Sequence, residues 1–295
     1  RKKWSFRELP VRYASTTKIY RDEQTGELSG LSRVRSITQD DAHVFCNMAA
    51  TESEVKIIWD MLNEFYARFN LPLKVRLSLR DPKKPEKYLG AEKIWEDAEK
   101  ILKTVAEERK VNYFEAEGEA TFYGPKLDFM ATDSLGREWQ VATIQVDLNM
   151  PKSFNLEFAN EQGGQSKIYI IHSAIMGSIE RFMSILIEHY AGAFPLWLAP
   201  EQIWILPISD KFSAYAKDVR QKLLKLSEDL RVRVNDENET LGKRIRQGET
   251  MKIPYLLIVG EREMSNNTIS VRERGKGDTG SMELQQFIEK IRKVW

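Results

Sequence analysis

Residues 38–43 read Thr-Gln-Asp-Asp-Ala-His, and this stretch is the most informative part of the 295-residue sequence. In a β-strand, alternate side chains point to opposite faces, so Gln39, Asp41 and His43 would share one face. An amide, a carboxylate and an imidazole on one face can hold an amine, a hydroxyl or a metal ion. Folding alone explains such a cluster poorly. The stretch therefore predicts a β-sheet that forms the floor of an active site.

The residues before this stretch predict its hairpin partner. We expect one strand over residues 18–23 and a second over residues 32–45. Arg21 and Glu23 are two apart on the first strand, and Arg33 lies across the hairpin. Guanidinium groups bind phosphate bidentately, and a carboxylate accepts a hydrogen bond from an exocyclic amine. A surface ladder of cross-strand ion pairs is the alternative interpretation, and the polar stretch beside it weakens that alternative.

Bulk composition limits the class of protein. The sequence is 42% hydrophobic and 30% charged, as in a globular protein, and its net charge is only +1. Any RNA contact must therefore come from local basic patches. No apolar run approaches the roughly 20 residues that cross a bilayer, so we expect no membrane association. The single cysteine, Cys46, excludes an internal disulfide and suits the reducing cytoplasm.

The pattern of elements predicts two domains. Residues 1–197 alternate antiparallel strands with inserted helices, which favours an α+β domain. A Pro-containing segment at residues 194–200 marks a boundary. Residues 198–295 then alternate strand and helix, ending in a helix over residues 282–294, which predicts an α/β domain with a mostly parallel sheet.

Three further groups of residues carry chemistry. Ser178 and Arg181 lie three apart on a predicted helix over residues 173–190 and would share a face, where a solvated helix face is the alternative. His43 and His172 suggest zinc, but a stable site needs at least three protein ligands, and Cys46 faces the other side of its strand. The polar side chains of residues 123–126 and 139–145 form either a pocket or an ordinary half-buried sheet. No P-loop or dinucleotide fingerprint is present.

Together these residues resemble class II aminoacyl-tRNA synthetases in the form found in the threonine-specific family. Residues 20–43 resemble motif 2 of that class and residues 177–182 resemble motif 3. Residues 122–126 and 139–147 also match the threonine-specific pattern, and residues 201–295 resemble the anticodon-binding domain. The likeness covers essentially the whole chain, with several motifs in the correct order.

The resemblance implies a role for each site residue. The implied catalytic residues are Arg21, Arg33 and Arg181, which would hold the phosphates of ATP. Glu23 would read the adenine amino group. The implied ATP site is completed by Gln140, Thr143 and Ser178, and the threonine site by Gln39, Asp41, Tyr123, Lys126 and Gln145. Zinc would be held by His43, His172 and a cysteine upstream of residue 1. In the second domain the resemblance implies anticodon contacts from Arg274 and Asn238, and phosphate contacts, or a solvated basic face, from Lys243, Arg244, Arg246 and Arg272.

The implied function is threonine–tRNA ligase, which activates threonine with ATP and Mg²⁺ and transfers it to tRNA(Thr). One zinc ion per subunit and a homodimer are implied as well. A catalytically impaired, synthetase-like RNA-binding regulatory protein is the alternative, and a sister synthetase for serine or proline is a third possibility. The sequence departs from the family at Ile37, where many relatives place an aromatic residue, and at Ala142, where they carry glycine. It begins at Arg1 without methionine, as expected for the C-terminal part of a longer protein that lacks motif 1 here.

Overall fold

The computed structural model describes residues 2–227 and 229–293. The chain divides into two compact units, Arg1–His189 and Tyr190–Trp295, and each is described by itself. The domain boundary expected after residue 197 falls a few residues inside the second unit and stays a prediction.

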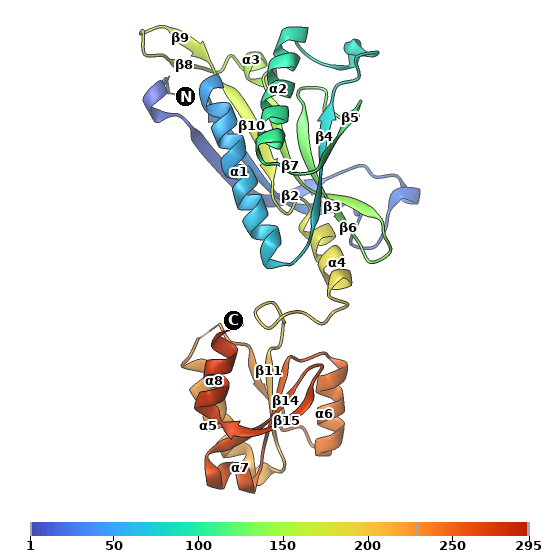
Figure 1. The fold of residues 1–295 in the computed structure, drawn as a ribbon, viewed down its shortest axis with the longest axis vertical. Coiled ribbons are helices and arrows are strands. Elements are labelled where there is room, and N and C mark those ends of the chain that lie inside the picture. The colour runs from blue at the N-terminus through green and yellow to red at the C-terminus, as the bar shows by residue number, and fades with distance from the viewer. Residues whose placement is uncertain (1, 228, 294–295) are drawn as a thin grey trace. The chain divides into compact units, whose positions relative to one another are not determined.

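The first unit is built on a seven-stranded sheet of order β2-β3-β10-β7-β6-β4-β5 (Figure 1). Every neighbouring pair is antiparallel except β4 and β5, which are parallel. The α+β class predicted for this part of the chain is therefore confirmed. The strands are β2 (Val11–Tyr20), β3 (Ser36–Cys46), β4 (Leu73–Leu79), β5 (Tyr113–Glu117), β6 (Lys126–Thr132), β7 (Glu138–Asp147) and β10 (Tyr169–Ala174).

Two long helices, α1 (Met48–Arg68) and α2 (Glu92–Glu108), pack side by side on this sheet (Figure 1). The helix α1 begins after Asn47, whose side chain accepts a hydrogen bond from the Ala50 amide at 2.9 Å. Its apolar face is buried on the sheet, where the Trp59 ring meets the edge of Phe129 at 5.0 Å. A third helix, α4 (Ile179–His189), packs near β3.

Short elements complete the first unit. A small sheet of order β1-β8-β9 joins β1 (Trp4–Ser5), β8 (Glu157–Ala159) and β9 (Gln165–Lys167). The remaining elements are α3 (Met150–Ser153) and the 3₁₀ turns η1 (Phe6–Glu8), η2 (Thr25–Glu27) and η3 (Pro85–Lys87). No described helix in either unit is long and apolar enough to cross a membrane.

The predicted hairpin strands are displaced from where the sequence placed them. The strand β2 ends at Tyr20 and β3 begins at Ser36, so Arg21, Glu23 and Arg33 lie on the loop between them. This loop closes on itself because the Ser29 and Arg33 backbones pair with each other, at 3.0 and 3.1 Å. The prediction that Arg21 and Glu23 share a strand face is therefore wrong, although the pairing of β2 with β3 is correct.

The second unit is a five-stranded sheet of order β12-β11-β13-β14-β15. The strand β11 (Ile203–Pro207) is parallel to β12 (Val232–Val234) and β13 (Tyr255–Val259), but β14 (Thr268–Glu273) and β15 (Gly277–Glu283) continue antiparallel. The mostly parallel sheet expected from the sequence holds for three strands, and the whole sheet is mixed. The sequence did not predict β15. The helical elements are η4 (Asp210–Phe212), α5 (Ser213–Leu224), α6 (Leu241–Thr250), α7 (Glu261–Asn266) and α8 (Leu284–Arg292).

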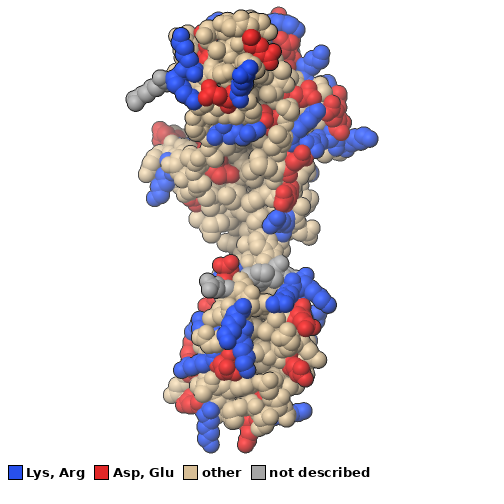
Figure 2. All heavy atoms as spheres, turned by 90° about the vertical axis from the view of Figure 1, so that its left-hand side faces the viewer, with Lys and Arg blue, Asp and Glu red and all other residues tan. Residues whose placement is uncertain are grey.

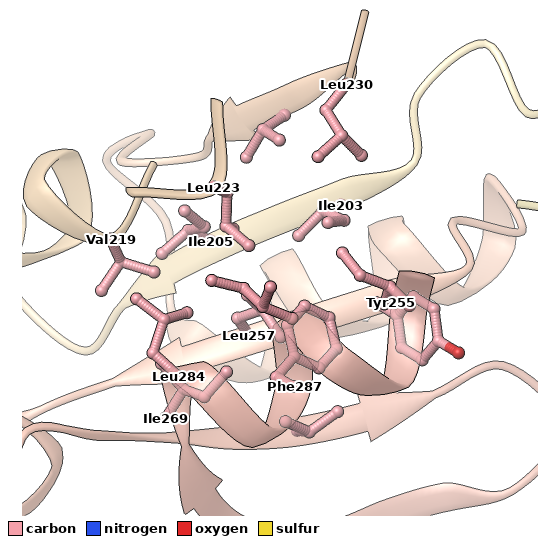
Figure 3. Close-up of a cluster of buried hydrophobic side chains, with 14 of the residues drawn as sticks. Ile203, Ile205, Val219, Leu223, Leu230, Tyr255, Leu257, Ile269, Leu284 and Phe287 are labelled. Atoms are coloured by element: carbon pink, nitrogen blue, oxygen red, sulfur yellow. The ribbon is translucent and has the colours of Figure 1, made fainter. Parts of the chain in front are cut away.

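The core of the second unit lies between the sheet, α5 and α8. Figure 3 shows Ile203 and Ile205 of β11 and Leu257 of β13 packed with Leu223 of α5 and Phe287 of α8. The final helix starts at Leu284 because residues 277–283 form β15, and the expected end at residue 294 lies outside the described residues. In Figure 2 basic and acidic side chains are mixed on the displayed face of each unit, as the net charge of +1 predicts.

Candidate active site

One pocket of the first unit gathers all seven side chains expected to bind ATP. Its empty volume is about 630 Å³, including the part that opens to solvent. The walls come from the loop after β2, from β3 and β7, and from the turn that leads into α4. The lining residues are Arg21, Glu23, Ser32, Arg33, Val34, Ile37, Gln39, Gln140, Val141, Ala142, Thr143, Ala174, Gly177, Ser178 and Arg181. Both family departures, Ile37 and Ala142, belong to this wall.

Two arginines enter the pocket from the loop after β2. The Arg33 guanidinium donates to Glu23 at 2.8 Å and lies 3.1 Å from Glu27. The hydrogen bond that Arg33 donates to Glu23 is the main reason that the pKa of Arg33 is raised. Arg21 has a weak contact, 3.5 Å from its Nη2 to the Gln39 amide oxygen. Few protein contacts therefore hold the Arg21 guanidinium at the pocket.

A third arginine, Arg181, closes the pocket from α4. Its Nε donates to the Ser32 carbonyl at 2.8 Å and its Nη1 to the Gln140 carbonyl at 3.2 Å. Its guanidinium carbon lies 5.3 Å from the centre of the Trp139 ring. Burial lowers the pKa of Arg181, and the positive charges of Arg21 and Arg33 lower it further. An anion in the pocket would relieve this repulsion.

The start of α4 differs from the predicted helix. The strand β10 ends at Ala174 and α4 begins only at Ile179, so Ser178 precedes the helix instead of sharing its face with Arg181. The Ser178 hydroxyl accepts from the Arg181 amide at 3.2 Å and so caps the first turn. In the turn, Gly177 has a φ of +64°, and an added Cβ would lie 2.7 Å from the Val141 carbonyl oxygen. Only glycine satisfies both constraints.

A second group of predicted residues lies further along the same sheet. His43 of β3 and His172 of β10 pair directly across the two strands, with ring centres 4.8 Å apart. Both residues lie within their strands. The Tyr123 ring is 5.4 Å from His172, and its hydroxyl donates to Gln145 at 2.5 Å.

The electrostatics of this second group link it to Asp41. Burial lowers the pKa of His43, and the neighbouring His172 lowers it further, while the Asp41 carboxylate opposes the change. Burial also raises the pKa of Tyr123, with a smaller contribution from Asp41. These interactions place Asp41 near both rings, as expected if its side chain shares a face of β3 with His43.

Lys126 is held by a buried acid. Its side chain is 9% exposed, and its Nζ lies 2.5 Å from Oδ2 of the fully buried Asp128. The same carboxylate oxygen accepts from Arg76 at 2.9 Å and from Ser78 at 2.7 Å. Lys126 does not line the ATP pocket, although it pairs with Gln145 across β6 and β7.

The second unit positions its predicted residues differently. The guanidinium of Arg274 donates to the carbonyls of Lys252 and Phe194, at 2.7 and 2.6 Å, and burial lowers its pKa. Arg274 and Arg272 line the same hollow, and Arg272 is 2.9 Å from Glu249. Asn238 is exposed before α6.

Arg244 does not lie on a basic face. It is 4% exposed, and it donates to the carbonyls of Asn235 at 2.7 Å and Pro207 at 2.8 Å. The interpretation of this arginine as a phosphate contact is wrong, because its donors are used inside the unit. Lys243 is exposed and pairs with Glu239 at 2.5 Å, and Arg246 is exposed.

Comparison with known proteins decides the family. Residues 1–190 match the tRNA synthetase class II core domain (G, H, P, S and T), and residues 202–294 match the anticodon binding domain. A crystal structure described as the RNA binding domain of threonyl-tRNA synthetase from Cryptosporidium parvum Iowa II superposes with a TM-score of 0.89. It is 34% identical, over 99% of this chain and 72% of that one. This chain belongs to the threonyl-tRNA synthetases.

Other relatives agree with this family. The putative threonyl-tRNA synthetase ThrRS-1 of Aeropyrum pernix is 30% identical, with a TM-score of 0.78, over 97% of this chain and 68% of that one. The threonine–tRNA ligase of Phocaeicola vulgatus is 46% identical over 284 residues, 96% of this chain. This synthetase chain spans 44% of that relative's length. The resemblance seen in the sequence is confirmed.

The two imidazoles lie side by side and are ligands of a type that zinc takes. In residues 2–227 and 229–293 no three His, Cys, Asp or Glu side chains are grouped to hold a metal ion. Cys46 is buried 3.6 Å from the Thr51 hydroxyl, which agrees with its exclusion as a third ligand. His43 and His172 therefore fit zinc as two ligands of an incomplete set.

Two carboxylates that contact the site or its supporting turn are not among the residues predicted from the sequence. Oδ2 of the fully buried Asp147 lies 3.1 Å from His172 Nε2, and its Oδ1 accepts from the Asn149 and Met150 amides. Its position at the end of β7, beside Gln145, was the available signal. Asp40 was passed over because the alternation of β3 points it away from Gln39 and Asp41. Its contacts are described below.

Proposed function

We propose that the complete protein containing this chain is a threonine–tRNA ligase. Three arginines and Glu23 converge on one pocket beside a sheet that carries His43 and His172, with Tyr123 on the turn before β6, and this convergence is the observation that carries the proposal. Its curated relatives are named threonine–tRNA ligases. The activity, its substrates and its partners remain proposals because the chain spans 44% of those relatives.

The pocket would bind ATP together with Mg²⁺. Arg21, Arg33 and Arg181 would hold the phosphates, because their shared positive charge needs an anion. Glu23 would accept from the adenine amino group while keeping its ion pair with Arg33. Gln140, Thr143 and Ser178 would complete the wall.

The neighbouring part of the sheet would bind threonine. Asp41 would accept from the hydroxyl, with Gln39, Tyr123, Lys126 and Gln145 around it. Zinc would be held by His43, His172 and one further ligand from outside this chain. When bound, it would supply a Lewis acid for the amine and hydroxyl of threonine, and valine has no hydroxyl to offer.

The reaction follows from this arrangement. A threonine carboxylate oxygen would attack the α-phosphorus, and the bond to pyrophosphate would break. The three guanidinium groups would neutralise the charge that develops on the phosphate oxygens. Most of the rate would come from positioning, as for other displacements at phosphorus. The terminal ribose hydroxyl of tRNA would then take the threonyl group from AMP.

The second unit would bind the anticodon of tRNA(Thr). Arg274 and Asn238 would contact bases, and Arg272, Lys243 and Arg246 would contact RNA. We propose that the complete protein works as a homodimer in the cytoplasm, where the buried Cys46 of this chain stays reduced.

Threonine-dependent exchange of pyrophosphate into ATP by the complete protein tests the proposal. We expect exchange with threonine but not with proline or valine, and charging of tRNA(Thr). Intact tRNA binding without exchange would favour an RNA-binding regulatory protein instead. Metal analysis should find one zinc per subunit, and an active metal-free enzyme would contradict the zinc assignment.

A further inference from the structure

The two faces of β3 have different roles. Gln39 lines the ATP pocket, whereas Asp40, its neighbour, does not. Side chains alternate along a strand, so Asp40 and Thr38 point to the opposite face. On that face Asp40 contacts the segment that joins β10 to α4, and Thr38 contacts Glu180 in the first turn of α4.

Asp40 binds the turn that leads into α4. Its Oδ2 accepts hydrogen bonds from the backbone amides of Ile175 and Met176, both at 2.9 Å. Its own amide donates to the Gly177 carbonyl at 3.3 Å. At this point β10 has ended, so the turn occupies the place of a neighbouring strand, and one bridge joins Gln39 to Ser178. The Asp40 carboxylate therefore accepts hydrogen bonds that the carbonyls of a neighbouring strand would otherwise accept from this turn.

The same turn is held from two other directions. The hydroxyl of Tyr66, a buried residue of α1, donates to the Ile175 carbonyl at 2.8 Å. Gly177 lies tightly against the Val141 carbonyl on the opposite side. A separate contact holds the first turn of α4, where the Glu180 carboxylate accepts from the Thr38 amide at 2.9 Å and from its hydroxyl at 2.9 Å.

The turn sets the position of a pocket wall. It supplies Gly177 and Ser178 to the lining beside Ala174 of β10, and three residues after Ser178 the chain places Arg181. A turn of four residues with a single bridge to β3 has several accessible conformations. A carboxylate that accepts two of its amides removes that freedom, because leaving both amides unpaired in a half-buried place is costly.

We propose that Asp40 is a positioning residue for nucleotide binding, whose carboxylate fixes the turn at residues 175–178 and thereby the placement of Ser178 and Arg181. This role rests on the proposed function, because it assumes that the pocket binds ATP. Asp40 does not touch the pocket itself, so it acts only through the turn. Oδ1 of Asp40 is buried and has no partner among the described residues, which leaves the whole interaction on Oδ2.

Two substitutions of Asp40 in the complete protein separate the loss of its hydrogen bonds from the loss of its charge. Asp40→Ala removes the acceptor, and we expect the KM for ATP in threonine-dependent exchange to rise at least about tenfold. Asp40→Asn can keep its oxygen on both amides and put its NH₂ where Oδ1 has no partner. We expect a rise of about two- to threefold for this variant, because only the charge is lost. The KM for threonine should stay within about twofold in both.

Tyr66→Phe is a third variant that keeps the packed ring and loses only the hydroxyl. It should also raise the KM for ATP, because it frees the same turn from the other side. If Asp40→Ala does not fold, Asp40→Asn and Tyr66→Phe still test the role. In the double variant their effects should fall short of the product of the single effects.

Glu54→Gln is the matched control. Glu54 is a buried acid of α1 that binds Arg12 at 2.7 and 2.8 Å, outside the pocket. It should lower the melting temperature and leave the KM for ATP unchanged. Folded Asp40 variants with an unchanged KM for ATP would overturn the positioning role, as would equal losses for ATP and threonine. An unmutated protein without exchange activity would instead refute the proposed function.

Discussion

Arginines are used in opposite ways in the two units. In the first unit, Arg21, Arg33 and Arg181 line one pocket, and the mutual repulsion of their charges contributes to the lowered pKa of Arg181. In the second unit, Arg244 and Arg274 donate to main-chain carbonyls at 2.6 to 2.8 Å. Like charges are brought together at a cost, whereas carbonyls satisfy a guanidinium within the fold.

This difference separates sites from scaffolding better than residue type does. The distinguishing feature is the clustering of cations and not the carbonyl contacts, because Arg181 also donates to the carbonyls of Ser32 and Gln140. Arginines that face one another gain free energy when an anion arrives. The first unit therefore has a pocket whose clustered cations favour an anion, whereas in the second unit Arg272 and Arg274 line one hollow.

The largest expected effect comes from Arg181→Ala. Removing one cation from the proposed phosphate site should lower kcat/KM for ATP about 10³-fold in threonine-dependent exchange, roughly 4 kcal/mol of transition-state stabilisation. The matched change in the second unit, Arg274→Ala, should leave exchange within about twofold, because exchange needs no tRNA. Equal losses in the two variants would break the contrast between the units.

Ion pairs provide the next comparison. Asp128→Ala leaves Arg76 and Lys126 without their buried partner, and we expect the free energy of unfolding to fall by about 3 kcal/mol. In the second unit, Glu273 pairs with the more exposed Lys276 and Lys290, both at 2.6 Å, so Glu273→Ala should cost less than about 1 kcal/mol. Denaturant titration measures both losses of unfolding free energy. Similar losses would show that burial does not determine how much these ion pairs contribute to stability.

A smaller effect tests whether Arg244 is structural. Arg244→Met leaves the buried carbonyls of Asn235 and Pro207 without donors, and should destabilise the second unit by about 2 kcal/mol. The exposed Arg246→Met is the control, with an expected change within about 0.5 kcal/mol. Denaturant titration of the two variants measures both changes. Weakened RNA binding by a fully stable Arg244→Met protein would restore the phosphate interpretation.

The smallest effect is the acid dependence that Asp133 gives to the stability of the first unit. Burial opposes ionisation of Asp133, but hydrogen bonds from Trp139, Arg137 and Leu135 outweigh it and lower its pKa from 3.8 to about 2. The stability that this carboxylate adds is therefore complete above roughly pH 4 and is lost as the pH falls through about 2. The stability gap between the natural protein and Asp133→Asn should shrink between pH 6 and pH 2.5. A constant gap would contradict the assignment.

The sequence predicted the membership of the ATP pocket better than its geometry. The family motifs appear in order, so all seven expected ATP residues line one pocket. Arg21 and Glu23 were nevertheless placed on a strand, because alternation alone cannot show that the backbone leaves the sheet after Tyr20. Ser178 was placed inside a helix because its own capping hydrogen bond was not anticipated.

Other features could not be predicted for a physical reason. The partners of Asp40 are backbone amides 135 and 136 residues away, and a side-chain pattern carries no trace of them. The strand β15 follows a turn with Gly275 and Gly277 at positive φ, so the region has the composition of a loop. The sequence suggests that His43 and His172 act together, but only the register of β3 and β10 shows that they lie side by side.

Gly177 has a consequence for inhibitors of this enzyme family. A compound bound against Gly177 would contact main-chain atoms there, whereas resistance usually arises when a side chain is substituted. Any replacement here must accept a φ of +64° and a contact of 2.7 Å with the Val141 oxygen. A substitution of Gly177 that weakened inhibitor binding would therefore also destabilise the fold.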